Sequence, residues 1–125
     1  GEVKKLFQND LEGTISKYSI IQNAKLYRKG IAIAVVDHTV SRITAAQAAD
    51  ELLNIIGIDT SFVLYPDKER IIISARSMGE HNVQVILEPL GGGGNAAAAG
   101  GQIPDKTLEQ VVAELHQSID QYLDH

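Results

Sequence analysis

The chain is organised around the run Gly91-Gly92-Gly93-Gly94-Asn95-Ala96-Ala97-Ala98-Ala99-Gly100-Gly101, which holds six of its eleven glycines. No side chain in this run is large enough to fill a core, and only Asn95 is polar. Glycines adopt backbone angles that other residues avoid, and without a Cβ they let a ligand come close. Successive N–H groups that point at one place form an anion-binding nest. A flexible linker is the alternative, but the structured-looking sequence on both sides favours a ligand-binding loop.

Two common nucleotide-binding motifs are excluded by the order of the elements. A P-loop needs a strand, then G-x-x-x-x-G-K-[ST], then a helix. Here a helical segment precedes the run, and Asn95-Ala96 stand where Lys-Ser is required. The Rossmann fingerprint lies in a strand-to-helix turn that opens a βαβ unit, which this run is not. A nest formed here would therefore bind phosphate without a lysine.

The sequence around the run predicts short strands and helices. Apolar residues at three- and four-residue spacing predict a first helix over residues 3–18, which residues 19–23 can extend. A second helix is expected over residues 44–56, with Thr44 as its N-cap, Ile56 on its buried face and Gly57 as its stop. The other expected elements are strands at 24–27, 31–36, 61–65, 70–75 and 98–103, a helix at 83–88, and a last helix capped by Asp105 or Thr107. This order predicts an α/β (α+β) fold, a mixed β-sheet of about five strands covered by helices.

Composition limits the classes of function. The 125 residues suit one domain, and with 44% hydrophobic but only 5% aromatic residues the core must consist of Ile, Leu, Val and Ala. The net charge of −5 argues against an autonomous DNA-binding protein. Without cysteine there is no disulfide or thiolate metal site, which fits a cytosolic domain. The first residues, from Gly1 on, have neither the apolar region of a signal peptide nor an initiating Met, so we expect a piece of a longer protein.

Two polar clusters follow predicted strands. Asp37 and His38 end the strand at 31–36, but a metal site needs three or four ligands, and the other histidines lack ligand spacing. An exposed turn is therefore favoured there. The second cluster is Ser74-Ala75-Arg76-Ser77. The planar guanidinium of Arg76 matches phosphate oxygens and keeps its charge, so Arg76 is a candidate phosphate ligand, with a surface ion pair as the alternative. No catalytic residue and no metal ligand is predicted in this chain.

Together with Asn82-Val83-Gln84 and the glycine run, the Ser74–Ser77 segment resembles the DHHA1 domain of the DHH phosphoesterase superfamily. That domain's signature is a strand ending in S-x-R, a short helix and G-G-G-H-x-x-A-A-G. The form found here, S-A-R-S-x-G-x-x-N-V-Q, is most similar to the GdpP-type cyclic-di-AMP phosphodiesterases. The resemblance covers nearly the whole chain.

The resemblance implies a two-domain enzyme in which a DHH domain holds two metal ions, usually Mn²⁺, and DHHA1 grips the substrate across a cleft. Residues 1–23 would then be a linker helix from a missing DHH domain, and residues 24–125 the substrate-binding DHHA1 domain. GdpP-type enzymes linearise cyclic-di-AMP to pApA and carry membrane helices. The resemblance therefore implies a membrane-anchored parent with this part in the cytoplasm, no cofactor in this chain, and Mn²⁺ in the missing domain.

The family's substrate-binding residues carry over position by position. Arg76 would contact a substrate phosphate, with Ser74 and Ser77 supporting the strand end. Gly91, Gly92, Gly93 and Gly94 would present backbone N–H groups to phosphate or nucleobase. Asn95 stands where the family has histidine. A histidine can carry a positive charge or move a proton, whereas an asparagine amide can only donate and accept hydrogen bonds.

The expected partners are a cyclic dinucleotide or short oligonucleotide phosphate, the missing DHH domain and a second copy in a homodimer. Two other functions stay open. An oligoribonuclease or RecJ-like phosphoesterase acts on single-stranded nucleic acid, which requires stacking platforms and a basic groove. The few aromatic residues and the net charge of −5 argue against such a strand. The other is a non-catalytic nucleotide-binding interaction module with a structural glycine loop.

Overall fold

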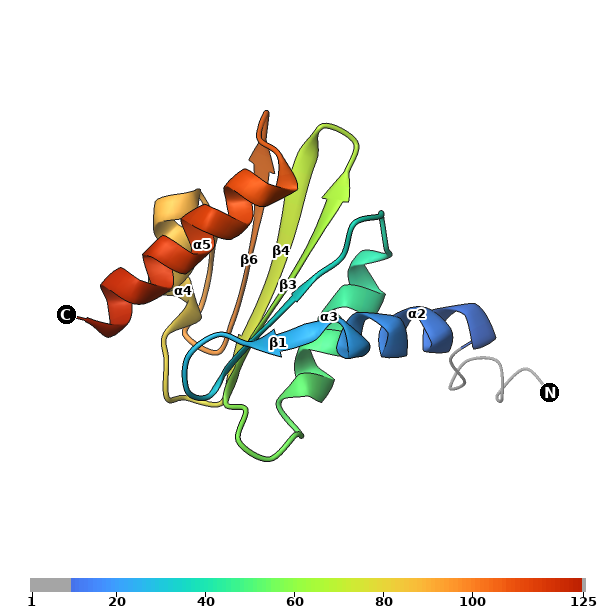
Figure 1. The fold of residues 1–125 in the computed structure, drawn as a ribbon, viewed down its shortest axis with the longest axis horizontal. Helices are drawn as coiled ribbons and strands as arrows, with labels where there is room; N and C mark the ends of the chain where they lie inside the picture. Colours follow the sequence, from blue (N-terminus) through green and yellow to red (C-terminus); the bar gives the residue numbers. More distant parts are fainter. Residues whose placement is uncertain (1–9, 125) are drawn as a thin grey trace.

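The structure is a computed structural model that describes residues 10–124. A mixed sheet of six strands in the order β1-β2-β3-β4-β6-β5 forms its centre (Figure 1). β2 and β3 are parallel and every other neighbouring pair is antiparallel. The strands are β1 Ala24–Leu26, β2 Ile31–Val35, β3 Thr60–Asp67, β4 Arg70–Ser77, β5 Gly93–Gly94 and β6 Ala98–Pro104. The predicted mixed sheet is confirmed. The strand that the sequence did not predict is β5, inside the glycine run.

Helices cover both faces of the sheet. On one face lie α2 Leu11–Gln22 and α3 Arg42–Leu52, and on the other α4 Val83–Leu87, the short 3₁₀ helix Glu88–Leu90 and α5 Leu108–Leu123 (Figure 1). Of these described helices, none is long and apolar enough to cross a membrane.

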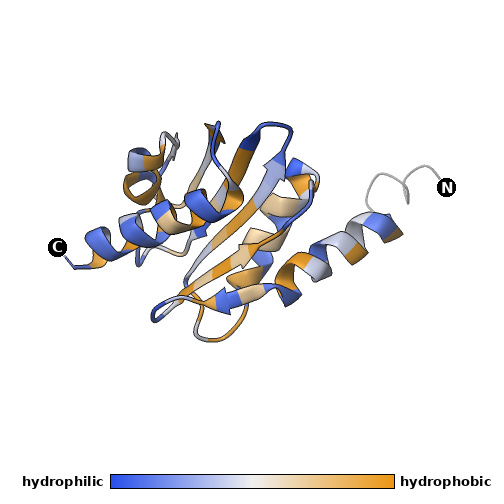
Figure 2. Ribbon diagram, turned by 45° about the horizontal axis from the view of Figure 1, so that its top comes forward, coloured by the Kyte–Doolittle hydropathy of each residue, from blue (hydrophilic) through white to orange (hydrophobic). Residues whose placement is uncertain are grey.

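The core forms two layers because side chains alternate along each strand. On β4, Ile71 and Ile73 face α5, whereas Ile72 faces α3. Figure 2 shows hydrophobic residues concentrated along the inner strands between the helices. The buried side of α3 is mostly alanine, with Ala45, Ala48 and Ala49 fully buried, so this helix lies close to the sheet. Continuous burial of Ile31–Ala34 confirms that β2 is covered on both faces.

The predicted limits of α3 were wrong at both ends. Its N-cap is Ser41, whose hydroxyl accepts the N–H of Thr44, so Thr44 lies within the first turn. The helix ends at Leu52. Beyond it, N–H groups bond carbonyls three residues back, as in Ile55 to Leu52. This tighter turn changes the angular spacing of side chains, and Ile56 is 100% exposed rather than buried.

The first helix also differs from its prediction. Residues 3–9 of the predicted segment lie outside the described residues. Asp10 caps α2 by accepting the N–H of Gly13. The expected apolar stripe does not pack on the sheet, because Leu11 and Ile15 are 74% and 59% exposed and the helix is anchored by Ile20 near its C-terminal end.

The last helix, α5, begins at one of its two predicted caps. Thr107 caps it through a capping box with Gln110.

Candidate functional site

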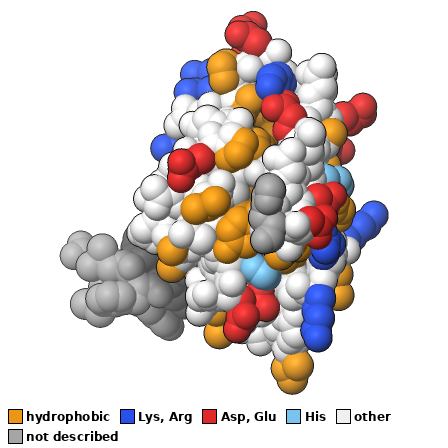
Figure 3. Space-filling model, turned by 90° about the vertical axis from the view of Figure 1, so that its left-hand side faces the viewer, with side chains coloured by type: hydrophobic (Ala, Val, Ile, Leu, Met, Phe, Trp, Pro, Cys, Tyr) orange, Lys and Arg blue, Asp and Glu red, His pale blue; other side chains and the backbone are white. Residues whose placement is uncertain are grey.

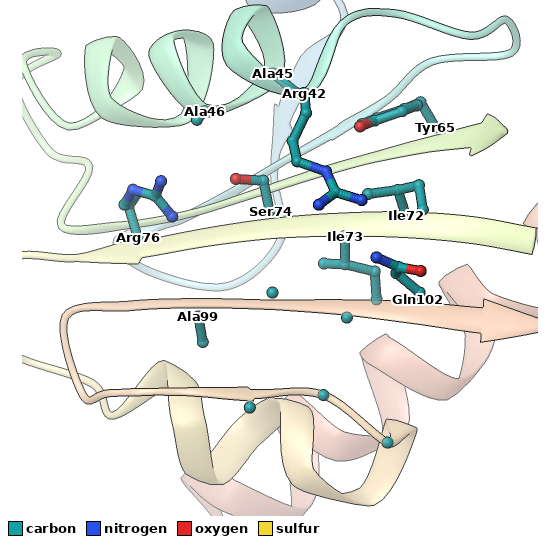
Figure 4. A pocket seen from close by; sticks show the side chains of 15 residues that line it. Arg42, Ala45, Ala46, Tyr65, Ile72, Ile73, Ser74, Arg76, Ala99 and Gln102 are labelled. Atoms are coloured by element: carbon teal, nitrogen blue, oxygen red, sulfur yellow. The ribbon is translucent and has the colours of Figure 1, made fainter.

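A cleft of about 470 Å³ opens on the α3 side of the sheet. Its floor is the uncovered part of β4 and β6, one wall is the first half of α3, and the opposite rim is the start of the glycine run (Figure 4). The lining residues are Arg42, Ala45, Ala46, Tyr65, Ile72, Ile73, Ser74, Arg76, Gly91, Gly92, Gly93, Ala99, Gly100, Gly101 and Gln102.

The cleft exists because β6 contributes almost no side-chain volume beside β4. Ser74 pairs with Gly100 and Arg76 with Ala98. Directly paired residues project on the same face of a sheet, so the space next to Ser74 and Arg76 stays open. Two residues that the sequence singled out, Ser74 and Arg76, therefore lie together on an exposed sheet face.

Arg76 is held in a defined orientation at one end of the cleft. Its Nε lies 3.1 Å from Oδ1 of Asp50 on α3, and one terminal nitrogen donates to the carbonyl of Ala75 at 2.8 Å. The other terminal nitrogen has no partner among residues 10–124. The side chain is 23% exposed. A fixed guanidinium with a free edge suits a phosphate oxygen, because little side-chain entropy is lost on binding.

The two serines that were predicted to belong to the site, Ser74 and Ser77, lie on opposite faces of β4. Ser74 faces the cleft between Arg42 and Arg76 (Figure 4), and within the described chain its hydroxyl has no hydrogen-bond partner. Ser77 projects from the opposite face of β4 and is buried. Its hydroxyl accepts the N–H groups of Gly79 and His81 and so supports the strand end. Ser77 does not line the cleft.

The glycine run does not form the predicted nest at its first two positions. The N–H of Gly91 donates to the carbonyl of Glu88, and that of Gly92 to the carbonyl of Leu87. These bonds satisfy carbonyls that the end of a helix leaves free, so the two N–H groups do not face a ligand. Gly91, Gly92 and Gly93 line the cleft through their lack of side chains, whereas Gly94 does not line it.

Asn95 has a structural task. Its side-chain oxygen accepts the N–H groups of both Ala97 and Ala98 at 2.9 Å, and its own N–H donates to the carbonyl of Ala98. It thereby holds the turn between β5 and β6, as asparagine often does in turns. The tip of the turn is tied to the rest of the fold, because Ala96 and Ala97 accept the N–H groups of Val83 and Ser77. Asn95 does not line the cleft.

Replacing Asn95 by alanine is expected to lower the free energy of unfolding by about 1 kcal/mol, because two hydrogen bonds in an exposed turn are lost. Replacing it by aspartate keeps an oxygen in the same place and should change stability by less than half that amount. Urea denaturation of both variants measures the difference. Equal stability of the alanine and aspartate variants would contradict the structural role of the amide oxygen.

Three polar residues of the cleft were missed by the sequence reasoning: Arg42, Tyr65 and Gln102. Burial raises the pKa of the Tyr65 hydroxyl, and the charge of the nearby Arg42 guanidinium partly opposes that rise. The alternation of β4 and β6 could have placed Gln102 on the face of Ile72, with which it pairs. Arg42 gave no local signal, because α3 reaches this face only through the crossover between β2 and β3.

The Asp37–His38 pair is not part of a metal site among the described residues. Asp37 and His38 bond each other, with Nδ1 of His38 3.0 Å from Oδ1 of Asp37, and this hydrogen bond lowers the pKa of Asp37. Both side chains are largely exposed. Within residues 10–124, no group of three His, Cys, Asp or Glu side chains is placed to hold a metal ion.

Comparison with known proteins places this geometry in a family. Cyclic-di-AMP phosphodiesterase PdeA of Listeria monocytogenes is 40% identical over 124 residues, covering 96% of this chain and 19% of that protein. Cyclic-di-AMP phosphodiesterase GdpP of Bacillus subtilis is 35% identical over 127 residues, covering 98% and 19%. The chain thus spans about a fifth of the length of these curated relatives.

The fold is also found among solved structures. An exopolyphosphatase-related protein from Bacteroides fragilis superposes with a TM-score of 0.83 at 22% identity, covering 95% of this chain and 37% of that one. At this identity the likeness concerns the fold alone. The family model of the DHHA1 domain matches residues 28–124, which include the cleft strands, α3 and the glycine run. The chain therefore belongs to the DHHA1 domain family.

Proposed function

We propose that this chain is the substrate-binding part of a phosphodiesterase that hydrolyses cyclic-di-AMP to pApA. The observation that carries the proposal is the free edge of the Arg76 guanidinium beside the Ser74 hydroxyl, which has no hydrogen-bond partner among the described residues, where β6 contributes only Ala98 and Gly100 to the sheet face. The similarity to the cyclic-di-AMP phosphodiesterases PdeA and GdpP supports the choice of nucleotide.

The cleft suits a phosphodiester chemically. Arg76 supplies a permanent positive charge and directed N–H donors to the phosphate oxygens. Ser74 lies two residues before Arg76 on the same face of β4 and adds a hydroxyl donor. Gly100, which pairs with Ser74, leaves the floor open, so a nucleotide can approach the backbone there without meeting a Cβ. The cleft volume of about 470 Å³ lies in the range of ordinary small-molecule sites.

Binding is tested by titrating the ¹⁵N-labelled chain with cyclic-di-AMP and with pApA, and following amide shifts by NMR. We expect shifts at Ser74, Arg76, Gly93 and Gly100, and none at Ser77 or on α5. A folded chain that shows no shift at millimolar nucleotide would overturn the proposal. Shifts confined to α5 or the β1–β2 turn would place binding elsewhere and overturn the assignment to this cleft.

Hydrolysis is proposed to require a part of the parent protein that this chain does not contain. The described residues provide no set of metal ligands, and the resemblance to DHH phosphoesterases implies that metal ions held by another domain would activate the attacking water. Incubation of this chain with cyclic-di-AMP and Mn²⁺ should therefore give no pApA above a blank. The readout is chromatography of the nucleotides. Turnover by the purified chain, abolished in the Arg76→Gln variant, would contradict this prediction.

A single-stranded nucleic acid is a weaker alternative as ligand. Such proteins stack successive bases on aromatic side chains along a basic groove. In the cleft, Tyr65 is the one aromatic lining residue, and it is only 3% exposed. On the side of the molecule that carries the C-terminal helix, acidic and basic side chains are interspersed (Figure 3). Neither feature favours a long polyanion over a dinucleotide.

A further inference from the structure

A second cation lies in the cleft at the end opposite Arg76. Arg42 is the first residue of α3, and its side chain descends from the helix over Ile72 toward Gln102 (Figure 4). Within the described chain, Arg42 forms no ion pair with a carboxylate. Its guanidinium is therefore an uncompensated positive charge that projects into a concave site.

The position of Arg42 in its helix works against folding rather than for it. The N-terminal end of a helix carries a partial positive charge, so a cation in the first turn is disfavoured. The first turn of α3 contains no acidic residue to compensate. Helix stability therefore does not account for an arginine here, whereas an anion in the cleft would interact favourably with it.

Gln102 adds a donor that is already oriented. Arg70 donates from a terminal nitrogen to Oε1 of Gln102 at 2.6 Å. Because arginine can only donate, this bond fixes which end of the amide is oxygen. The amide nitrogen of Gln102 is left facing the space below Arg42 (Figure 4). Gln102 pairs with Ile72, so it lies at the same level of the sheet as the Arg42 side chain.

The two cationic ends of the cleft are separate places. Ile72, under Arg42, and Arg76 stand four residues apart on β4, a backbone distance of roughly 13 Å at the usual strand rise. Arg76 is tied to its own end by Asp50 and by the carbonyl of Ala75. Because a phosphate bound by Arg76 lies within about 3 Å of its nitrogens, this spacing favours a separate anion at Arg42.

We propose that Arg42 and Gln102 form a second anion-binding subsite, and that the cleft takes a nucleotide with two phosphate groups, one at each end. Arg70 acts behind this subsite by fixing the Gln102 amide. The inference rests on the proposed function for the Arg76 end, and it adds the requirement for a second phosphate. It also explains how one cleft distinguishes a dinucleotide from a mononucleotide.

The test compares adenosine 5′-monophosphate with pApA by ¹H–¹⁵N NMR titration of the wild-type chain and the variants Arg42→Gln, Arg76→Gln and Lys29→Gln. Lys29 is exposed in the β1–β2 turn, outside the cleft, so its variant controls for the loss of one positive charge. Arg42 is exposed too, and thermal melts check that each variant is folded.

We expect Arg42→Gln to weaken pApA binding about tenfold, as for one lost charge-assisted hydrogen bond, and to leave the monophosphate affinity unchanged. Lys29→Gln should change neither.

The outcomes separate this inference from the function on which it rests. Unchanged pApA affinity in Arg42→Gln, with loss in Arg76→Gln, overturns the second subsite and leaves the proposed function standing. Equal weakening of the mononucleotide and the dinucleotide by Arg42→Gln also overturns it, because both arginines would then serve one phosphate. If neither nucleotide binds the folded wild-type chain, the proposed function fails and this inference fails with it.

Discussion

Replacing Arg76 by glutamine is expected to lower nucleotide affinity by between tenfold and a hundredfold while the fold stays intact. The variant removes a charged donor that the structure holds ready at the cleft, and hydrogen bonds to charged groups contribute roughly 1.5–3 kcal/mol. Stability should change little, because Asp50, the ion-pair partner of Arg76, is 64% exposed and such pairs contribute at most about 1 kcal/mol.

The measurement is isothermal titration or NMR titration with pApA, beside urea denaturation of the same variant. Arg76→Lys is the informative companion, because it keeps the charge but loses the planar fork that meets two oxygens at once. We expect it to bind with intermediate affinity. An Arg76→Gln chain that binds pApA within twofold of the wild type would remove Arg76 from the site.

Replacing Gly94 by alanine is expected to destabilise the chain by roughly 3 kcal/mol. Gly94 has a φ of +147°, which residues with a Cβ rarely adopt. A Cβ at this position would collide with the carbonyl of Ala98 and lie 2.6 Å from the Cα of Ala99. Backbone strain and overpacking each cost about 1–3 kcal/mol.

The matched control for Gly94 is its neighbour. A Cβ on Gly93 would meet nothing within 4 Å, and the φ of Gly93 is not positive. Gly93→Ala should therefore unfold within about 0.5 kcal/mol of the wild type, whereas Gly94→Ala should melt roughly 10 °C lower. Thermal denaturation of the two variants decides the matter. Equal melting temperatures would show that the β5–β6 hairpin can shift to accept the methyl group.

The parts of the site that follow from a local pattern were predictable from sequence. Ser74 and Arg76 end an apolar run of alternating strand residues, and that alternation alone puts both on one face. The position of Gly57 suggested the end of a helix, but the real end comes earlier, at Leu52. The turns that follow it are held by backbone bonds between residues three apart and are mostly exposed, so the periodicity of apolar side chains does not describe them.

The glycine run shows where local reasoning stops. Four adjacent glycines can form a nest, but the end of the preceding helix offers carbonyls that also need partners. Gly91 and Gly92 bond those carbonyls, and Asn95 closes the hairpin that follows. The glycine run therefore provides space in the cleft, but the backbone N–H groups of Gly91 and Gly92 are not free to bind a ligand. Arg42 was not predictable either, because its approach to Gln102 depends on how a crossover helix lies over strands distant in sequence.

The pairing of β4 with β6 also sets when the cleft forms as the chain folds. β3 and β4 are joined by a tight turn, whereas residues 78–97 separate β4 from β6. Closing the longer loop costs more chain entropy, so we expect the local hairpin to form earlier and β6 to dock later. Arg76 and Gln102 share a cleft only once that docking is complete. A nucleotide that binds there selects the finished sheet, and at a hundred times its dissociation constant it stabilises the folded state by about 2.7 kcal/mol.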